Sequence, residues 1–269
     1  MNEKIIFTGI TIVILLASSI AGCKGIQSET TNLAAPTNSE TAAGTSSLST
    51  ASILPTATLQ QLSPTHDLTA YAFPDSIDPA KQYLFYLHGK IIEDQGIPAI
   101  SPDYGEYEYE AILEKLSGYG LIVISEQRPK NTDGVAYARK VTEQVKALLN
   151  AGVPAKNITV AGASKGAGIT VYVSHFLENE EINFVIMAIC HPDNVAEFKR
   201  DQIFLFGNVL SIYDSADELA GSCQGLFSFS EGKGIARYDE VVLNVGTGHG
   251  ILYQPLDEWM TPLIQWAYK

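Results

Sequence analysis

The most constraining feature of this sequence is a series of short apolar runs, separated by stretches with helical character. The runs are rich in β-branched and aromatic residues, at residues 83–87, 121–125, 157–161, 184–189, 209–213 and 240–245. Continuous apolar strands that alternate with helices are typical of a parallel sheet covered on both faces. The sequence therefore predicts an α/β fold with a mostly parallel central sheet.

The stretches between the runs place apolar residues at helical spacing. We expect helices at residues 107–116, 135–149, 167–177 and 255–268. The chain of 269 residues is long enough for one sizeable domain, and no internal repeat is visible. The interval between Ile189 and Val209 is too short for a large cap domain, so a single folded domain is expected at residues 63–269.

The charge balance of the chain excludes some classes of partner. There are 30 acidic residues against 17 basic ones, which gives a formal net charge of −13. This balance argues against electrostatic binding to nucleic acid or to anionic lipid headgroups. Hydrophobic residues make up 46% of the chain and charged residues 17%, which excludes wholesale disorder.

The first 22 residues have the pattern of an export signal. A polar start with Lys4 precedes an apolar stretch of about 16 residues, whereas a membrane-spanning helix needs about 20. The stretch ends in Ile20-Ala21-Gly22-Cys23, which resembles the lipobox of bacterial lipoproteins. The resemblance implies a signal peptide at residues 1–22 and lipidation of Cys23. The domain would then be anchored to a membrane of the bacterial cell envelope, outside the cytoplasm; an uncleaved transmembrane helix is the alternative.

Residues 23–62 begin with Cys23 and continue as a segment rich in Ser, Thr, Ala and Asn. A segment with so few large apolar residues cannot bury enough surface to offset its ordering entropy. We expect a disordered tether between the lipid anchor and the domain.

A G-x-S-x-G pattern, Gly162-Ala163-Ser164-Lys165-Gly166, follows the apolar run at residues 157–161 and opens a predicted helix. This is the strand–turn–helix context of a nucleophile elbow, in which glycines let two backbones pass closely. The helix N-terminus also favours a developing negative charge. The spacing is not that of a phosphate-binding P-loop, so the pattern predicts Ser164 as a nucleophile.

His88-Gly89-Lys90 directly follows the apolar run at residues 83–87. With the serine motif, this pattern is similar to that of the α/β-hydrolase family, small bacterial esterase-like members included. The resemblance implies that this loop shapes an oxyanion hole. Its donors would be the backbone amides of Lys90 (or Ile91) and Lys165, with His88 and Gly89 supporting the loop.

A serine hydroxyl needs a base, and the base needs an acid that fixes its tautomer. His249 lies in a glycine-rich loop after the last strand, where the family places its base. The acid is expected after the strand at residues 209–213, where Asp214 and Asp217 are both candidates. The family often has a G-x-x-D turn there, which places Asp214 at the glycine and favours Asp217. The order Ser164, Asp217, His249 is that of α/β-hydrolases.

The chain has three cysteines, too few for a four-thiolate zinc site. Once Cys23 is lipidated, Cys190 and Cys223 remain, each after a strand expected to neighbour the other. Because an exported protein meets oxidising conditions, we expect a Cys190–Cys223 disulfide, with two free buried thiols as the alternative. A Cys190–His191 dyad is disfavoured because adjacent residues on a strand end point apart. In the tyrosine-rich acidic stretch at residues 103–110, a tyrosine could line a pocket.

These residues predict a serine hydrolase that cleaves an ester bond through a Ser–His–Asp triad and an acyl-enzyme. The substrate would be a small-molecule or lipid acyl compound, and no metal, cofactor or nucleic acid is expected. One alternative is a binding lipoprotein of the envelope that keeps the fold without catalysis. Another is a peptidase or lipase acting at the membrane. The sequence indicates neither an acyl-chain length nor an oligomeric state.

Overall fold

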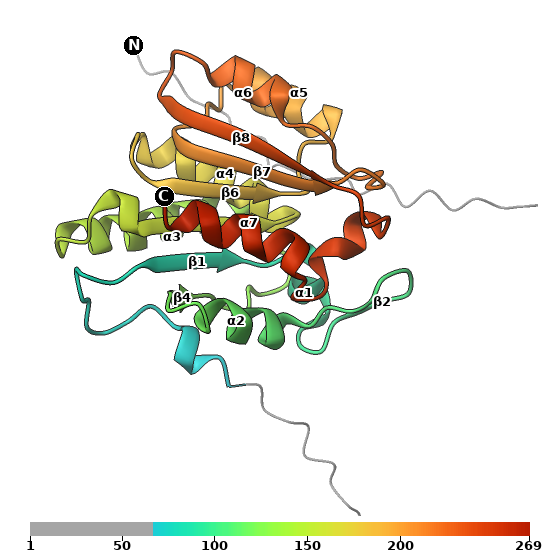
Figure 1. Cartoon of the computed structure of the whole chain (residues 1–269), viewed down its shortest axis with the longest axis horizontal. Helices are drawn as coiled ribbons and strands as arrows, with labels where there is room; N and C mark the ends of the chain where they lie inside the picture. The colour runs from blue at the N-terminus through green and yellow to red at the C-terminus, as the bar shows by residue number, and fades with distance from the viewer. Residues whose placement is uncertain (1–66) are drawn as a thin grey trace, which may run out of the picture. The chain divides into compact units, whose positions relative to one another are not determined.

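Six parallel strands form the central sheet in the order β4-β1-β5-β6-β7-β8 (Figure 1). The computed structural model describes residues 67–269. The strands of the sheet are β1 (Tyr83–Leu87), β4 (Ile122–Ile124), β5 (Ile158–Ala163), β6 (Asn183–Met187), β7 (Gly207–Asp214) and β8 (Ile235–Leu243). This strand order is that of the α/β-hydrolase fold, so the predicted fold class is confirmed.

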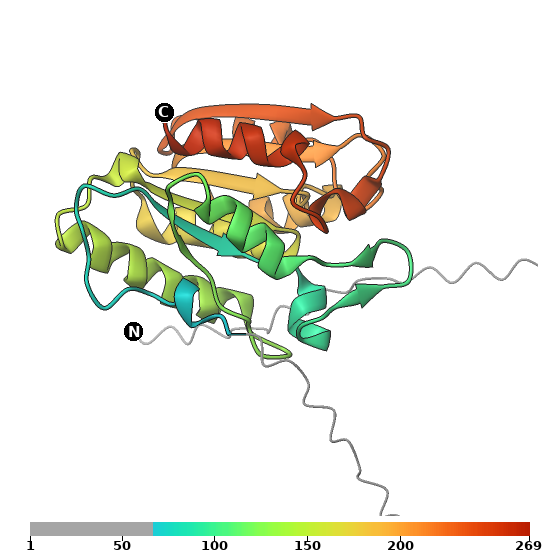
Figure 2. The same cartoon turned by 60° about the horizontal axis from the view of Figure 1, so that its bottom comes forward.

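Helices cover both faces of the sheet (Figure 2). They are α1 (Lys90–Gln95), α2 (Tyr109–Ser117), α3 (Gly134–Asn150), α4 (Lys165–Leu177), α5 (Pro192–Arg200), α6 (Gln224–Ser230) and α7 (Asp257–Ala267), with short turns η1 (Thr69–Tyr71), η2 (Ala155–Asn157) and η3 (Gly248–Leu252). Apolar side chains of α2 and α7 pack on one face, and those of α3 to α6 pack on the other. In β1, Tyr83, Phe85 and Leu87 face α3 and α4 while Leu84 and Tyr86 face α2 and α7, which explains an apolar run without alternation.

Three short helices and a hairpin were absent from the expectations. Helices α1, α5 and α6 have at most nine residues each, and β2 (Ile100–Ser101) pairs with β3 (Gly105–Glu106) in a two-stranded hairpin. Segments this short carry too few turns for a helical period to be visible. Strand β8 begins at Ile235 rather than at the predicted residue 240. Most of this edge strand is not buried, so its first half has no apolar run from which the strand could be predicted.

The structure contains the predicted disulfide between Cys190 and Cys223. Cys190 follows β6 and Cys223 follows β7, and these two strands pair in parallel. The bond therefore fastens the segment after β7 to the end of β6. Because Cys190 is oxidised, it holds no free thiol for a dyad with His191.

The predicted signal peptide at residues 1–22, the lipidated Cys23 and the tether to residue 62 lie outside the described residues. Within residues 67–269, none of the helices combines the length and apolar character that crossing a membrane requires.

Candidate active site

Ser164 lies at the sharp turn between β5 and α4. Its backbone is at φ 52° and ψ −117°, a conformation that costs a non-glycine residue about 1–3 kcal/mol. A Cβ added at Gly166 would lie 1.9 Å from the Leu87 carbonyl oxygen, and one at Gly162 would lie 2.2 Å from the Gly166 oxygen. Both glycines are therefore required by the close crossing of β5, α4 and β1. The crossing presents the serine, half-buried, at the carboxyl edge of the sheet.

Asp217 and His249 are joined by a hydrogen bond of 2.8 Å between Oδ2 and Nδ1. The Asp217 side chain is fully buried, and that of His249 is 11% exposed. Because a carboxylate only accepts, Nδ1 is the donor of this bond, which leaves Nε2 as the acceptor of the neutral imidazole. This is the tautomer that a general base of a serine hydrolase needs.

Asp214, the alternative acid, has a different set of partners. Its Oδ1 accepts the amide of Ala216 at 2.8 Å, and its Oδ2 accepts the amides of Val245 and Gly246 at 2.9 and 3.1 Å. The carboxylate thus connects the loops after β7 and β8. Of the two predicted candidates, Asp217 is the one in contact with His249.

Ser164, Asp217 and His249 follow β5, β7 and β8, so all three lie at the same edge of the parallel sheet. No direct hydrogen bond joins the Ser164 hydroxyl to the His249 imidazole, both of which lie within the described part of the chain. In ligand-free enzymes such bonds are often long and tighten only when substrate is bound. The three residues thus lie at one sheet edge in the order predicted, and Asp217 and His249 are joined by a hydrogen bond.

The predicted oxyanion donors lie at the starts of two helices. Lys90 and Ile91 open α1, and Lys165 opens α4. The first amides of an α-helix have no acceptor inside the helix, so these three N–H groups are free to bind an anion. A Cβ added at Gly89 would lie 3.8 Å from the Cβ of Ser164, which places the start of α1 beside the serine.

His88 is buried behind this loop. Its Nε2 accepts the amide of Arg128 at 2.9 Å, and its Nδ1 lies 2.8 Å from the carbonyl oxygen of Gly89. Burial, followed by the charge of Arg128, holds the pKa of His88 well below its usual range. The ring is therefore neutral, with its proton on Nδ1, and both nitrogens are used in fixing the loop.

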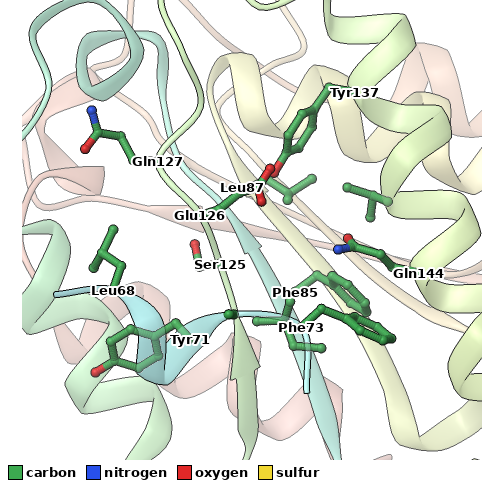
Figure 3. A pocket seen from close by; sticks show the side chains of 13 residues that line it. Leu68, Tyr71, Phe73, Phe85, Leu87, Ser125, Glu126, Gln127, Tyr137 and Gln144 are labelled. Carbon is green, nitrogen blue, oxygen red and sulfur yellow. The ribbon is translucent and has the colours of Figure 1, made fainter. Parts of the chain in front are cut away.

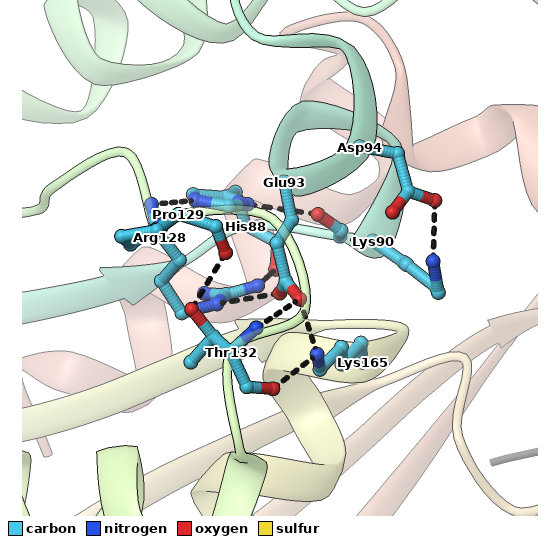
Figure 4. Close-up of polar contacts among 9 residues, drawn as sticks. His88, Lys90, Glu93, Asp94, Arg128, Pro129, Thr132 and Lys165 are labelled. Atoms are coloured by element: carbon cyan, nitrogen blue, oxygen red, sulfur yellow. Dashed lines mark hydrogen bonds and ion pairs between the residues drawn. The ribbon is translucent and has the colours of Figure 1, made fainter. Parts of the chain in front are cut away.

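A buried ionic cluster behind the serine turn was not predicted. Glu93, Arg128 and Lys165 meet there with Thr132 (Figure 4). The side chains of Glu93 and Arg128 are fully buried, and that of Lys165 is 12% exposed. The only sequence signal was a carboxylate in the short segment Lys90–Gln95 after the His88-Gly89 pair, and that signal does not identify its partners.

Tyr104 is the tyrosine of the 103–110 stretch that lies nearest to His249. It sits at the turn of the β2–β3 hairpin, with its ring centroid 6.5 Å from that of His249 and 5.3 Å from that of Tyr253. Burial and the negative charge of Asp217 raise the pKa of Tyr104. The hairpin thus places a neutral aromatic side chain at the mouth of the site.

A separate cavity of about 310 Å³ lies between β1, β4, η1 and α3 (Figure 3). Its lining includes Tyr71, Phe73, Phe85, Tyr137 and Gln144. Neither Ser164, Asp217 nor His249 lines it, so it is distinct from the candidate active site. Within residues 67–269, no group of three or more His, Cys, Asp or Glu side chains could hold a metal ion.

No protein-family profile and no curated protein sequence matches this chain. Among solved structures, SOBER1 from Arabidopsis thaliana is similar over 70% of this chain and 98% of its own, at 11% identity and a TM-score of 0.49. A phospholipase/carboxylesterase from Dyadobacter fermentans is similar over 72% of this chain and 94% of its own, at 15% identity and a TM-score of 0.48. A Pyrobaculum calidifontis esterase is similar over 72% of this chain and 77% of its own, at 17% identity and a TM-score of 0.45.

At these identities and TM-scores, the similarities identify no substrate and no catalytic residue. The strand order and the strand–turn–helix around Ser164 are features of this chain itself. On those two features, the chain has the α/β-hydrolase fold.

Proposed function

We propose that this protein is a serine hydrolase that cleaves an ester bond of a small-molecule or lipid substrate. His249 Nε2 takes the proton of the Ser164 hydroxyl as its oxygen attacks the acyl carbonyl. The amides of Lys90 (or Ile91) and Lys165 stabilise the oxyanion. The protonated His249, held by Asp217, then gives its proton to the leaving alcohol, and an acyl-enzyme remains on Ser164. Water deprotonated by His249 hydrolyses that intermediate.

The observation that carries the proposal is the conformation of Ser164. Ser164 is held at positive φ at a turn where the backbones of β5, α4 and β1 cross closely. Backbone strain of this kind clusters at active sites. The bonded Asp217–His249 pair at the same sheet edge supports it. Esters are the proposed class because an alcohol leaves more readily than an amine.

Labelling of the full chain with a fluorophosphonate probe tests the proposal. We expect the parent to be labelled and the Ser164→Ala and His249→Ala variants to stay unlabelled. Ser215→Ala is the matched control, because this exposed serine lies two residues before Asp217 and should be dispensable. A folded parent that is not labelled would contradict the hydrolase and favour a binding function. If the parent is labelled, turnover of short esters, long-chain esters in vesicles and peptides would identify the substrate class.

We also propose that the protein is a lipoprotein of the bacterial cell envelope, anchored to its membrane through Cys23. The Cys190–Cys223 disulfide supports export, because such bonds persist in oxidising compartments. Metabolic labelling with an alkyne palmitate analogue tests the anchor. The parent should incorporate the label and sediment with membranes, whereas Cys23→Ser should do neither. Equal labelling of the two would contradict the anchor.

A further inference from the structure

Glu93 bonds to three residues on two separate segments around the serine turn (Figure 4). It lies on α1, three residues after Lys90. Its Oε1 accepts Lys165 Nζ at 2.5 Å and the amide of Thr132 at 3.0 Å. Its Oε2 accepts Arg128 Nε at 3.3 Å. One carboxylate thus connects α1, the segment before α3 and the first residue of α4.

Two partners of Glu93, Lys165 and Arg128, make further hydrogen bonds between the segments around the serine turn. Lys165 Nζ donates to the Thr132 carbonyl at 2.7 Å. The guanidinium of Arg128 donates through Nη2 to the His88 carbonyl, and the amide of Arg128 donates to His88 Nε2. The loop before α1 and the start of α4 are therefore both fixed to the same segment, residues 128–132.

The charges of this cluster do not balance. One carboxylate faces two cations, and Arg128 Nη1, although buried, has no hydrogen-bond partner within the described residues. Buried ion pairs stabilise a fold poorly compared with apolar packing of the same volume. A cluster with an excess cation is thus a poor device for stability alone, and its position suggests another use.

That position is directly behind the predicted oxyanion donors. Lys165 supplies one amide and also the ammonium that bonds Glu93. Lys90 and Ile91 supply the other amide from the first turn of the helix that carries Glu93. The Glu93–Lys165 contact therefore links the two helices that supply the donors. Oxyanion stabilisation depends on donors preorganised to within a fraction of an ångström.

We propose that Glu93 is a positioning residue, which holds the Lys90/Ile91 amides and the Lys165 amide at the spacing that a tetrahedral oxyanion requires. The proposal rests on the hydrolase function proposed above. Geometry and charge give opposite expectations for Glu93→Gln, since this variant leaves the cluster with two cations and no carboxylate. If the cluster acted only through its electrostatic potential, the variant should bind an oxyanion mimic more tightly than the parent. If the cluster acts by positioning the amides, the variant should bind that mimic more weakly.

The proposal is tested by kinetics of the full chain with an ester and with a boronic acid. The boronic acid carries the same R group as the acyl part of the ester, with boron in place of the carbonyl carbon. For Glu93→Gln and for Lys165→Met we expect kcat to fall about 10- to 100-fold, with KM within about twofold. The inhibition constant of the boronic acid, which mimics the tetrahedral state, should rise in the same proportion. Lys165→Arg should recover part of the loss. The double variant should lose no more than the larger single one, because both remove the same contact.

Asp94→Asn is the matched control. Asp94 lies on the same helix and pairs with Lys90 at the surface, so this variant removes an ion pair of α1 without touching α4. It should leave kcat and the inhibition constant unchanged. A Glu93→Gln variant that keeps kcat, or that binds the boronic acid as tightly as the parent, would overturn the proposal. Should Glu93→Gln fail to fold, Lys165→Met decides it by the same criteria, because the side chain of Lys165 is not fully buried.

Hydrogen exchange separates this proposal from the hydrolase function. In Glu93→Gln, amides of residues 88–95 and 164–168 should exchange several-fold faster than in the parent, while in Asp94→Asn the second segment should not change. Unchanged exchange in Glu93→Gln would refute the positioning role even if the parent hydrolyses esters. A parent without esterase activity would refute the hydrolase, and exchange alone would then decide whether Glu93 couples the two segments.

Discussion

Asp214 Oδ2 accepts the backbone amide of Val245 at 2.9 Å, which ties the end of β7 to the loop that carries His249. Three residues later, Asp217 Oδ2 bonds the His249 imidazole. The two carboxylates therefore have different roles at this sheet edge. Asp214 fixes the backbone of the two loops, and Asp217 contacts the imidazole.

These different roles predict different effects for the same Asp→Asn substitution at the two positions. Asp217→Asn should lower kcat by a factor on the order of 10⁴, with little loss of stability, because an amide cannot hold the imidazole tautomer. Asp214→Asn should cost about 1–3 kcal/mol of unfolding free energy, since an NH₂ group would face backbone donors. Ester turnover and urea unfolding of both variants check this. A kcat lost in Asp214→Asn at parental stability would contradict it.

The crossing at Ser164 predicts that Gly166 tolerates no side chain. Gly166→Ala should lose more than about 3 kcal/mol or fail to fold, since its Cβ would overlap the Leu87 carbonyl. Gly168→Ala in the same helix is the control, because its Cβ would be in ordinary contact with Ile189. It should gain up to about 1 kcal/mol. Urea unfolding measures both, and a Gly166→Ala variant as stable as the parent would refute the steric argument.

Removal of the disulfide should destabilise the domain without changing its fold. The bond closes a loop with a sequence separation of 33, for which chain entropy gives about 3–4 kcal/mol. The double variant Cys190→Ser, Cys223→Ser should show this loss in urea unfolding. Dithiothreitol should destabilise the parent to a similar degree and leave the double variant unaffected. Two reactive thiols in the unreduced, folded domain would contradict the bond.

Buried His88 should make stability depend on pH. Its pKa in the folded state lies below that in the unfolded chain, so above about pH 6.5 both states are neutral and stability is full. At lower pH the unfolded chain gains a proton that the folded state excludes. Stability should then fall by up to about 1.4 kcal/mol per pH unit until the folded-state pKa is reached.

Urea unfolding between pH 7 and pH 5 measures this slope. His88→Asn should have a clearly shallower slope than the parent. His175→Asn should remove a smaller part, because burial also lowers the pKa of that half-buried imidazole. An unchanged slope in His88→Asn would assign the acid sensitivity to other groups.

Tyr104 should contribute to substrate binding rather than to chemistry. Its side chain is 38% exposed at the hairpin turn beside His249. Tyr104→Ala should raise KM several-fold and change kcat little. Tyr119→Ala is the control, since Tyr119 is 39% exposed and follows α2, outside the site. Equal effects of the two substitutions would remove Tyr104 from the binding surface.

The strands were predictable from sequence to the extent that they are buried. β1, β5 and β6 are buried along their whole length, so each is an almost continuous apolar run, with Thr159 and Asn183 as the polar exceptions. Edge strand β8 is mostly not buried, and only its apolar end was found. The Gly162–Gly166 motif and the glycine-rich loop around His249 are local patterns, which is why Ser164 and His249 could be singled out.

The rest of the site depends on contacts between distant segments. Glu93 lies 35 residues from Arg128 and 72 from Lys165 in sequence, and no local period relates them. The choice between Asp214 and Asp217 likewise depends on where the loop after β8 turns. Such pairings arise from tertiary packing, which a one-dimensional pattern does not encode.

The cluster of Glu93, Arg128 and Lys165 also limits how this chain can diverge. Replacing Glu93 alone leaves two cations without a counter-charge, whereas replacing Arg128 or Lys165 alone leaves the carboxylate one cationic partner. Glu93 should therefore be the least replaceable of the three positions. A descendant that keeps the serine turn but lacks Glu93 should therefore have lost Arg128 or Lys165 as well.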